Sequence, residues 1–510
     1  MISPRREKIS AVDTAWLRMD RPTNLMMICG VLIFGERVRY QRLAQIIETR
    51  FLKFHRFHQR PVQRPGRAYW ETVSPIAIDR QIQRISLPGR AGKNELQALV
   101  SRLAGVPLDA RRPLWQFHLV ENYEGGSALI ARIHHCYADG IALVRVLMSM
   151  TDAAPAGPPA MPFEPVPRGR RDDADDLLAQ LLQPIAGVMK LAKKAGATLI
   201  EKGAAIWSDP AKAVTLAEQG SALTAEIAKL ALMPQDSTTR FKGKPGVAKR
   251  VAWAEPIPLD EVKAISKVLA ASVNDVLLSC VAGALRQYLV AKGDAADGVM
   301  IRALVPVNLR PLDKAYRLGN QFGLVFLDLP LGIENPVERL YAVRSNMNAL
   351  KGSYQPVLAL GLLAAMGAGP KLLQEQLLQA LARNGSAVMT NVPGPQQQLY
   401  FAGAKIDRFL FWVPQSGDIG MGVSILSYAG RVQFGLITDS GLVPDPERIV
   451  DRFGAEFEKL VLTTLLSPWP REGDLDPSLA ARAVYSSSER ASSTSRRSIA
   501  SAGLHAAASL

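Results

Sequence analysis

Cysteine and histidine are both scarce in this chain of 510 residues, and each scarcity excludes a class of protein. The three cysteines, Cys29, Cys136 and Cys280, lie far apart in the sequence and form no CxxC pair. They cannot supply the framework of a disulfide-rich secreted protein, so we expect reduced thiols and a cytoplasmic location. The six histidines show no HExxH or zinc-finger spacing, and the sequence predicts no metal site.

Long apolar stretches are also missing. The longest runs, Leu25–Gly35 and Val357–Gly369, fall well short of the ~20 residues that a membrane-spanning helix needs. Asp13 and Asp20 precede the first run, and no small-residue cleavage site follows it. We therefore expect neither a transmembrane helix nor a signal peptide.

Positive charge is abundant: the formal net charge is +15, which favours anionic partners. Such a partner could be nucleic acid, an anionic membrane surface or a phosphate-bearing cofactor. The sequence holds no P-loop and no nucleic-acid-binding motif, so we expect no nucleic-acid partner.

Composition divides the chain into four parts. Residues 1–152 alternate predicted strands and helices and form an N-terminal domain, and residues 249–466 form a second mixed domain. Between them, residues 153–248 combine a Pro- and Ala-rich linker with a helical crossover, and residues 467–510 form a Ser-, Ala- and Arg-rich tail that we expect to be disordered. The predicted fold class is α/β with mixed sheets.

Two adjacent histidines, His134 and His135, stand at the end of a predicted strand, just before a helix that Gly140 opens. Sites in α/β proteins form at such strand ends. Adjacent residues on an extended backbone point to opposite faces, which suits them poorly to chelating one metal ion. With a pKa near 6.5, a neutral imidazole can take a hydroxyl proton near pH 7, so one histidine could act as general base while the other fixes the backbone. Two ordinary buried histidines are the alternative.

The stretch from His134 to Gly140 matches HHxxxDG, and here the sequence resembles the CoA-dependent acyltransferase superfamily, which includes chloramphenicol acetyltransferase and peptide-synthetase condensation domains. Further blocks resemble the bacterial wax ester synthase/diacylglycerol acyltransferase family in particular, in order over about residues 8–466. They are Ser10-Ala11-Val12-Asp13, Pro113-Leu114-Trp115, Ser272-Val273-Asn274-Asp275-Val276 with Ala282-Gly283-Ala284-Leu285-Arg286, Pro306-Val307-Asn308-Leu309-Arg310, Gly319-Asn320-Gln321 and Asn391-Val392-Pro393-Gly394-Pro395.

The resemblance implies two chloramphenicol-acetyltransferase-like domains with a tunnel at their interface. It also implies an acyl-CoA-dependent O-acyltransferase that esterifies a long-chain fatty alcohol, giving wax ester, or diacylglycerol, giving triacylglycerol. His135 would be the proton acceptor, and acyl-CoA a cosubstrate rather than a permanently bound cofactor. Only His505 follows it among the histidines, so one site per chain is expected. A condensation-type acyltransferase with another acceptor and a catalytically silent lipid-droplet coat protein are the alternatives.

The other residues of the motif have expected roles as well. By resemblance, His134 supports the loop, and Asp139 makes a structural ion pair with an arginine rather than a bond to His135. Gly140 is expected to permit a close turn from strand to helix. The candidate partners of Asp139 are Arg132, Arg302 and Arg310.

Substrate contacts are expected from three further places, each with a structural alternative. The resemblance places Asn274 and Asp275 at the tunnel, although plain helix capping also explains the pair. Ordinary core packing likewise explains the block Pro113, Leu114 and Trp115. Small residues share one face of the predicted helix Val357–Gly369, either as a wall for an alkyl chain or as a close helix contact. They are Gly361, Ala364, Ala365 and Ala368.

A water-insoluble product suggests attachment to a lipid surface. The basic, aromatic segment Phe54–Arg60 and the amphipathic segment Leu177–Lys194 could bind anionic lipid, or they could pack on the protein. We expect peripheral association with the inner membrane or with lipid droplets.

Overall fold

The structure is a computed structural model. It describes residues 6–64, 67–160, 233–309, 318–368 apart from Gly352 and Tyr354, and 371–466. The predicted crossover helix Leu177–Lys194, most of the predicted linker and the predicted tail all lie outside these ranges, as does Arg310.

The chain folds into two compact units that do not follow its linear order. Of the described residues, the first holds those within 6–256, 301–327 and 350–447, and the second holds those within 257–300, 328–349 and 448–466. Residues 350–447 thus belong with the N-terminal half of the chain. The predicted division into four parts depended on composition. Composition does not show which distant segments of the chain fold into the same unit.

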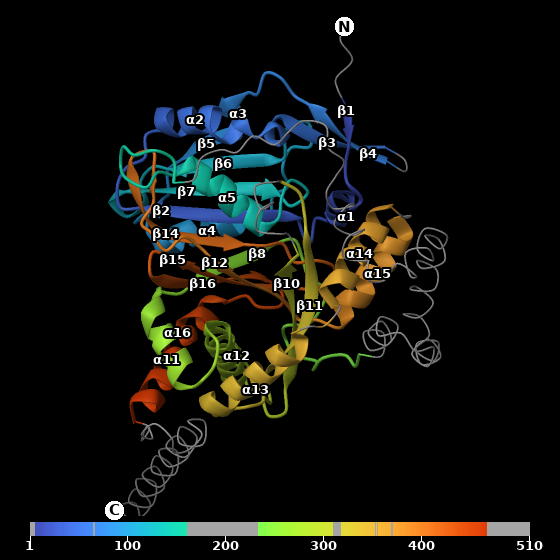
Figure 1. Cartoon of the computed structure of the whole chain (residues 1–510), viewed down its shortest axis with the longest axis vertical. Coiled ribbons are helices and arrows are strands. Elements are labelled where there is room, and N and C mark those ends of the chain that lie inside the picture. Colours follow the sequence, from blue (N-terminus) through green and yellow to red (C-terminus); the bar gives the residue numbers. More distant parts are fainter. Residues whose placement is uncertain are drawn as a thin grey trace, which may run out of the picture. The chain divides into compact units, whose positions relative to one another are not determined.

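The first unit contains a sheet that is completed by a distant segment. Its order is β13-β14-β2-β7-β6-β5 (Figure 1). Strands β2, β7 and β6 pair antiparallel, and β14 pairs antiparallel with β2. The bounds are β2 Met27–Phe34, β5 Ile82–Ile85, β6 Trp115–Val120, β7 Ser127–His134, β13 Tyr400–Phe401 and β14 Ala404–Trp412.

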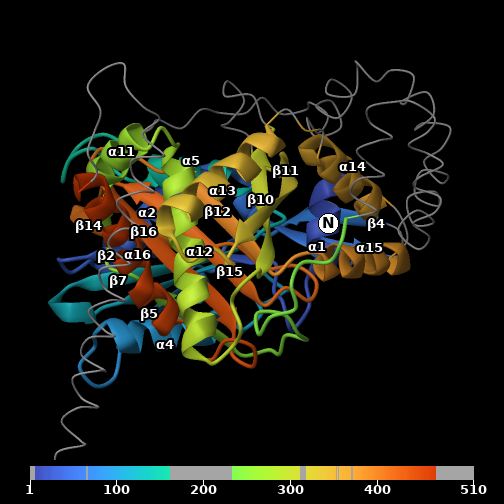
Figure 2. The same ribbon diagram turned by 90° about the horizontal axis from the view of Figure 1, so that it is seen from below.

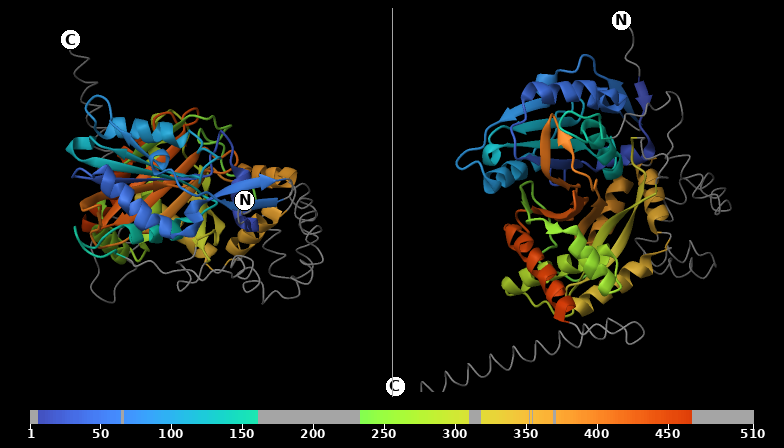
Figure 3. Two further views of the ribbon diagram at one scale, coloured as in Figure 1. Left: turned by 90° about the horizontal axis from the view of Figure 1, so that it is seen from above. Right: turned by 60° about the vertical axis from the view of Figure 1, so that its left-hand side comes forward.

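Helices cover both faces of this sheet, because successive side chains of each strand point to opposite sides. Helices α2 (Tyr40–Thr49) and α5 (Gly140–Met150) pack on the face that carries Leu32, Phe117 and Leu129. Helix α4 (Lys93–Ala104) packs on the other face, against residues such as Val31, Ile130 and Leu410 (Figure 3). The central strands β2, β6 and β7 are largely buried and mostly apolar, whereas the outer strands β5 and β14 also carry exposed charged residues.

A second sheet of the first unit is mixed, in the order β11-β10-β12-β15-β16-β8. Strands β10, β12 and β15 run parallel, whereas β15 and β16 form an antiparallel hairpin with Ala429 and Gly430 at its turn. The predicted class, α/β with mixed sheets, is confirmed. The bounds are β8 Lys249–Trp253, β10 Met300–Asn308, β11 Phe322–Pro330, β12 Ala387–Pro393, β15 Met421–Tyr428 and β16 Arg431–Asp439.

Smaller elements complete the first unit. A small sheet has the order β1-β4-β3, and helix α1 lies against α14. The bounds are β1 Arg6–Lys8, β3 Gln59–Arg64, β4 Arg67–Thr72, α1 Ala11–Met19, α3 Ile78–Gln81, α14 Gln355–Ala368 and α15 Lys371–Arg383, with short 3₁₀ turns at Phe51–Lys53, His55–His58 and Tyr123–Gly125.

The second unit is mainly helical, and α12 lies between α13 and α16 (Figure 2). The Arg339 guanidinium of α13 donates to the Ser279 carbonyl of α12 at 3.1 Å and forms a buried ion pair with Glu456 of α16. A side chain at Gly283 would collide with this pair, which accounts for that glycine. The bounds are α11 Leu259–Val268, α12 Val273–Ala291, α13 Pro336–Leu350 and α16 Glu447–Leu466, with the short strand β9 at Ile257–Pro258.

No single helix in the described part of the chain is long and apolar enough to cross a membrane. Helices α11 and α12 pass that test of length and composition only as a pair, with a bend of 101° between them.

Candidate active site

The histidine pair lies where β7 ends, in a loop that backbone hydrogen bonds hold from two sides. The His134 amide donates to the Leu114 carbonyl at 3.0 Å, and the His135 amide donates to the Met26 carbonyl at 2.7 Å. Both side chains are 3 % exposed. The loop therefore presents two buried imidazoles in fixed positions.

The block Pro113-Leu114-Trp115 contacts this loop through its backbone. The Leu114 amide donates to the Tyr137 hydroxyl at 2.9 Å, and that hydroxyl donates to the Gln59 carbonyl at 2.6 Å. The Trp115 indole N–H donates to the Phe57 carbonyl at 2.8 Å. These contacts give the block a structural part in the site, and its predicted part in substrate binding stays a prediction.

The two histidines have different surroundings. His134 turns its Nδ1 toward its own loop and accepts a hydrogen bond from the Cys136 amide at 3.1 Å. Its Nε2 lies 3.9 Å from Asp20 Oδ1. Burial lowers the pKa of His134 to about 3, with His135 adding to the effect. Because its Nδ1 already accepts a hydrogen bond from the loop, His134 supports the loop and has no lone pair left for a substrate proton.

His135 packs between aromatic rings. Its imidazole stacks on the Trp16 indole with ring centroids 4.2 Å apart and an interplanar angle of 17°, and the Phe322 ring lies 5.7 Å away. Burial lowers its pKa to about 4, while the charge of Asp139 acts in the opposite direction. His135 is therefore neutral at physiological pH, the state in which an imidazole can accept a proton.

Asn320 links the His135 backbone to a buried acid. Its side-chain amide donates to Asp13 Oδ1 at 2.7 Å and to the His135 carbonyl at 2.8 Å. Burial raises the pKa of Asp13, and the hydrogen bond from Asn320 opposes that rise. The Asp13 amide donates to Ser10 Oγ at 3.0 Å, which caps the start of α1. Two of the sequence blocks, residues 10–13 and 319–321, thus meet at His135.

Three polar atoms of this cluster are buried without a hydrogen-bond partner among the residues that the structure describes. They are Trp16 Nε1, His135 Nδ1 and Asn320 Oδ1. Buried polar atoms are nearly always paired, with protein or with water, so these three atoms are available to a water molecule or to a substrate. Sequence reasoning named His135 and missed the parts of Trp16, Asn320 and Phe322.

Asp139 caps α5 and ties the motif to the segment that carries Asn320. Its Oδ1 accepts from the Ala142 amide at 3.0 Å, and its Oδ2 accepts from the Gln321 amide at 3.1 Å. Of the candidate arginines, Arg132 contacts Gln116 and the Val106 carbonyl, Arg302 contacts the Pro234 and Asn384 carbonyls, and Arg310 lies outside the described residues. The predicted ion pair therefore stays a prediction.

The prediction that Gly140 is needed for a close turn from strand to helix is wrong. Its φ lies outside the left-handed region, and a Cβ at this position would meet no atom within 4 Å. The turn from strand to helix is thus open to any residue. What the glycine provides is empty space at the start of α5.

Asn274 and Asp275 lie in the second unit, at the start of α12. Ser272 and Asp275 form a reciprocal capping box: the Ser272 amide donates to Asp275 Oδ2 at 2.8 Å, and the Asp275 amide donates to Ser272 Oγ at 3.1 Å. This accounts for the Asp without a substrate, and Asn274 is exposed. The place of the pair at a tunnel, and the tunnel itself, stay predictions.

Helix α14 makes a close contact with α1 at Gly367, a small residue that the sequence analysis did not name. A side chain at Gly367 would collide with the Ala11 carbonyl. Gly361 and Ala364 are half-buried, and Ala364 packs against the core; Ala365 and Ala368 belong to α14, but their side chains are outside the described set. Their predicted part in a tunnel wall stays a prediction.

The three cysteines are buried free thiols. Burial raises the pKa of Cys29 to about 11 and of Cys280 to about 12, and it raises that of Cys136 well above the ordinary range. A nucleophilic cysteine needs its thiolate, so these three are poorly suited to covalent catalysis. No group of three or more His, Cys, Asp or Glu side chains gathers as a metal site in the described ranges.

Comparison with known proteins identifies the family. Residues 9–277 match the wax ester synthase/diacylglycerol acyltransferase catalytic domain, and residues 318–461 match the WS/DGAT C-terminal domain. A Mycobacterium bovis protein that carries the name diacylglycerol O-acyltransferase is 30 % identical over 497 residues, covering 91 % of this chain and 92 % of its own.

Two solved structures share the fold. A wax ester synthase/diacylglycerol acyltransferase from Marinobacter aquaeolei VT8 has a TM-score of 0.63 at 20 % identity, covering 90 % of this chain and 100 % of its own. The first condensation domain of the CDA synthetase has a TM-score of 0.54 at 15 % identity, covering 90 % and 97 %.

Proposed function

The chain belongs to the wax ester synthase/diacylglycerol acyltransferase family, and we propose that it transfers a fatty acyl group from acyl-CoA to the hydroxyl of a long-chain alcohol or a diacylglycerol, with His135 as general base. The observation that carries the proposal is the neutral, buried His135 in a rigid loop, beside buried polar atoms that have no partner within the described ranges. The acyltransferase class follows from the family. The acyl donor, the acceptor and the base are the proposed parts.

In the proposed step, His135 accepts the hydroxyl proton as the alcohol oxygen bonds to the thioester carbonyl carbon. The tetrahedral oxyanion then collapses, the carbon–sulfur bond breaks, and the CoA thiolate leaves and takes the proton back from the imidazolium. The Trp16 N–H is a buried donor available to a substrate oxygen. Direct transfer of this kind needs no acyl-enzyme, in keeping with three buried thiols of raised pKa.

The test is turnover by the purified chain. Palmitoyl-CoA is incubated with hexadecanol or with a diacylglycerol, released thiol is measured, and the ester product is identified by mass spectrometry. We expect thiol release that depends on the acceptor. A condensation-type enzyme would instead release thiol only with an amine acceptor, and a silent coat protein would release none.

The base is tested with a matched set of buried histidines. His135→Ala should lower kcat by about 100-fold or more, the usual contribution of a general base. His134→Ala should lower activity less and stability more, because its ring holds the loop. His118→Leu, at a buried histidine of β6 whose ring nitrogens have no partner in the described part of the chain, should leave kcat unchanged. A His135→Ala variant that keeps a tenth of the wild-type activity would remove His135 from the role of base.

We also propose peripheral association with the inner membrane or a lipid droplet, where a water-insoluble ester would accumulate. In the segment Phe54–Arg60, Phe57 is fully buried, whereas Phe54, His55 and Arg56 are partly or wholly accessible. Basic and aromatic groups on a surface bind anionic lipid with an affinity that salt weakens. Flotation with anionic vesicles at low and high salt tests this, and absence of binding at low salt would refute it.

A further inference from the structure

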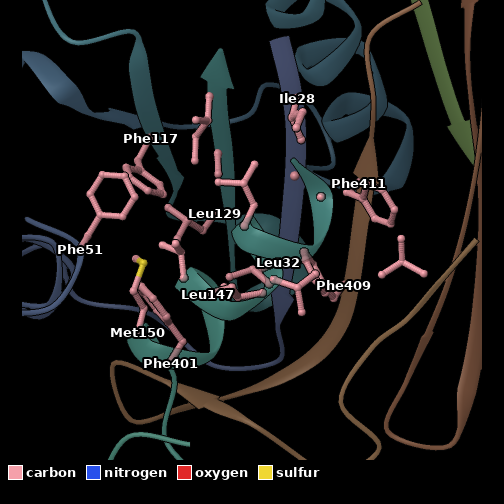
Figure 4. A pocket seen from close by; sticks show the side chains of 18 residues that line it. Ile28, Leu32, Phe51, Phe117, Leu129, Leu147, Met150, Phe401, Phe409 and Phe411 are labelled. Atoms are coloured by element: carbon pink, nitrogen blue, oxygen red, sulfur yellow. The ribbon is translucent and has the colours of Figure 1, made fainter. Parts of the chain in front are cut away.

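An apolar cavity lies between α5 and the six-stranded sheet of the first unit (Figure 4). Its volume is about 90 Å³, and all 18 residues that line it are apolar. The helix contributes one face, at spacings of three and four residues. These residues are Gly140, Leu143, Val144, Leu147 and Met150, together with Val146.

The floor of the cavity is a row of residues across four strands, large at both ends and small in the middle. Phe411 pairs with Gly30, Gly30 with Ala131, and Ala131 with Phe117. Every other residue of β2 and β7 is buried, whereas Gly30 and Ala131 are only half-buried. The hollow therefore comes from two small residues on adjacent central strands, with a phenylalanine ring on each side.

One end of the cavity reaches the catalytic loop. Ile133, which directly precedes the histidine pair, and Gly140, which ends the motif, both belong to its lining. Ile133 is two residues from His135, so their Cα atoms are at most about 7.6 Å apart. A side chain at Gly140 would enter open space, and the glycine keeps this end of the cavity clear.

Protein interiors are close-packed, and few voids exceed the size of a water molecule. A cavity of about 90 Å³ is several times the space that one water molecule needs, and without polar groups it offers nothing to a charged or hydrogen-bonding ligand. A hydrocarbon chain is the ligand that such a lining fits, and the adjacent loop holds the polar atoms that a carbonyl or hydroxyl group needs.

We propose that this cavity binds the saturated hydrocarbon chain of one of the two substrates, and that Gly30 and Ala131 set the chain length it accepts. The inference rests on the proposed function, because the chain's polar end would meet His135. In this proposal, residues of the sheet select the length of the hydrocarbon chain. The sequence had instead suggested the small residues of α14 as a wall for that chain, and no described residue of α14 lines the cavity.

The test fills the cavity and leaves the rest of α5 unchanged. Ala131→Ile adds a β-branched side chain to the floor, where strands favour such residues. Leu147→Phe adds a ring from the helix side. Met148→Phe is the matched control, since Met148 neighbours Leu147 on α5, is also half-buried and is not part of the lining.

Two series of substrates are compared: acyl-CoA of 8 and 16 carbons with hexadecanol held constant, and alcohols of 8 and 16 carbons with palmitoyl-CoA held constant. For each series we take the ratio of kcat/KM with the 16-carbon substrate to kcat/KM with the 8-carbon substrate. In one of the two series, both cavity variants should lower this ratio by about tenfold or more, because a mismatch of one methylene group in an apolar pocket has an effect of that size. Met148→Phe should keep the ratio of the wild type. The series that responds identifies whether the acyl or the alkyl chain occupies the cavity.

Calorimetric binding of palmitoyl-CoA alone and of hexadecanol alone, where nothing turns over, separates this inference from the proposed function. If the wild type binds one of them and both cavity variants bind it at least about tenfold more weakly, the cavity assignment holds even if no ester is formed. If the folded variants keep the wild-type ratio and the wild-type affinity, the cavity is not the chain site, whatever the enzyme's activity. Equal loss in Met148→Phe would also overturn the assignment.

Discussion

The indole of Trp16 stacks on the imidazole of His135, so a residue near the start of the chain forms one wall of the candidate active site. The indole N–H is buried and has no acceptor within the described residues. Stacking restricts the rotation of the imidazole, and the indole N–H lies beside the proposed base.

Trp16→Phe separates these two effects, because phenylalanine keeps a stacking ring and lacks the N–H. We expect kcat to fall by about 10- to 100-fold if the N–H donates to the substrate oxygen as negative charge develops there. Stability should change little, since the removal of a buried unpaired donor offsets part of the packing lost with the smaller ring. Single-turnover thiol release and urea unfolding measure the two quantities. An unchanged kcat would limit Trp16 to packing.

The second prediction concerns the bridge from Asp13 through Asn320 to the His135 carbonyl. Asn320→Ala removes the side-chain amide that donates to Asp13, and the buried Asp13 carboxyl group loses this hydrogen bond. We therefore expect a loss of about 1–3 kcal/mol in the free energy of unfolding. A double-mutant cycle with Asp13→Ala should give a coupling of about 0.5–3 kcal/mol, since the two side chains are in direct contact. Additive effects in the cycle would contradict the bridge. Both variants should also lower kcat, because the loop that carries His135 loses a support.

The third prediction is a loss of stability in acid. Burial lowers the pKa of His118 to about 3, from an ordinary value of about 6.5. Below pH 6.5 the unfolded chain binds a proton at this ring that the folded chain does not bind. The free energy of unfolding therefore falls by about 1.4 kcal/mol for each pH unit from 6.5 down toward 3.

His118→Leu isolates that contribution from those of the other buried groups. Above pH 7, the free energies of unfolding of the variant and the wild type should differ by a constant amount. As the pH falls to 5, the wild type should lose stability that the variant keeps. Urea unfolding at pH 7.5, 6 and 5 measures the difference. A difference independent of pH would show that His118 titrates normally.

The fourth prediction distinguishes the two explanations for the small residues of α14. Ala364 packs against the core, so Ala364→Ile should overpack this contact and cost about 1–3 kcal/mol without changing the preferred chain length. Thermal unfolding and the alcohol series above measure both. A variant of wild-type stability that prefers shorter alcohols would instead support the tunnel wall that the resemblance implies.

Local pattern was enough to locate many elements from the sequence. The sequence pattern predicts strands over Trp115–Val120 and Ser127–Ile133 and a helix over Lys371–Arg383. Strand β6 and helix α15 have these bounds, and β7 is longer by one residue. Their apolar residues recur with the period of a strand or a helix, and turn residues flank them. Helix α1 was missed because its apolar pattern is short, although Ser10 and Asp13 carry a capping signal that could have indicated it.

The motif pointed to His135, the proposed base, but not to the residues that surround it. Asn320 and Asp13 are 307 residues apart in the sequence, and Trp16 reaches His135 only because α1 folds back against the loop. A single sequence shows which residues are present and not which distant residues pack together. The same limit hid the row of Gly30, Ala131 and their flanking rings, which exists only once β14 has paired with β2.

The pairing of β14 with β2 has a consequence for synthesis of the chain. One edge of β2, from Cys29 to Phe34, stays uncovered until residues 406–412 leave the ribosome. At about 5–20 residues per second, that interval lasts about 20–75 s. During it, a nascent chain exposes an apolar strand edge of the kind that templates aggregation. Truncated N-terminal fragments should therefore need chaperones and precipitate without them, and soluble production of this enzyme requires the full length through β14.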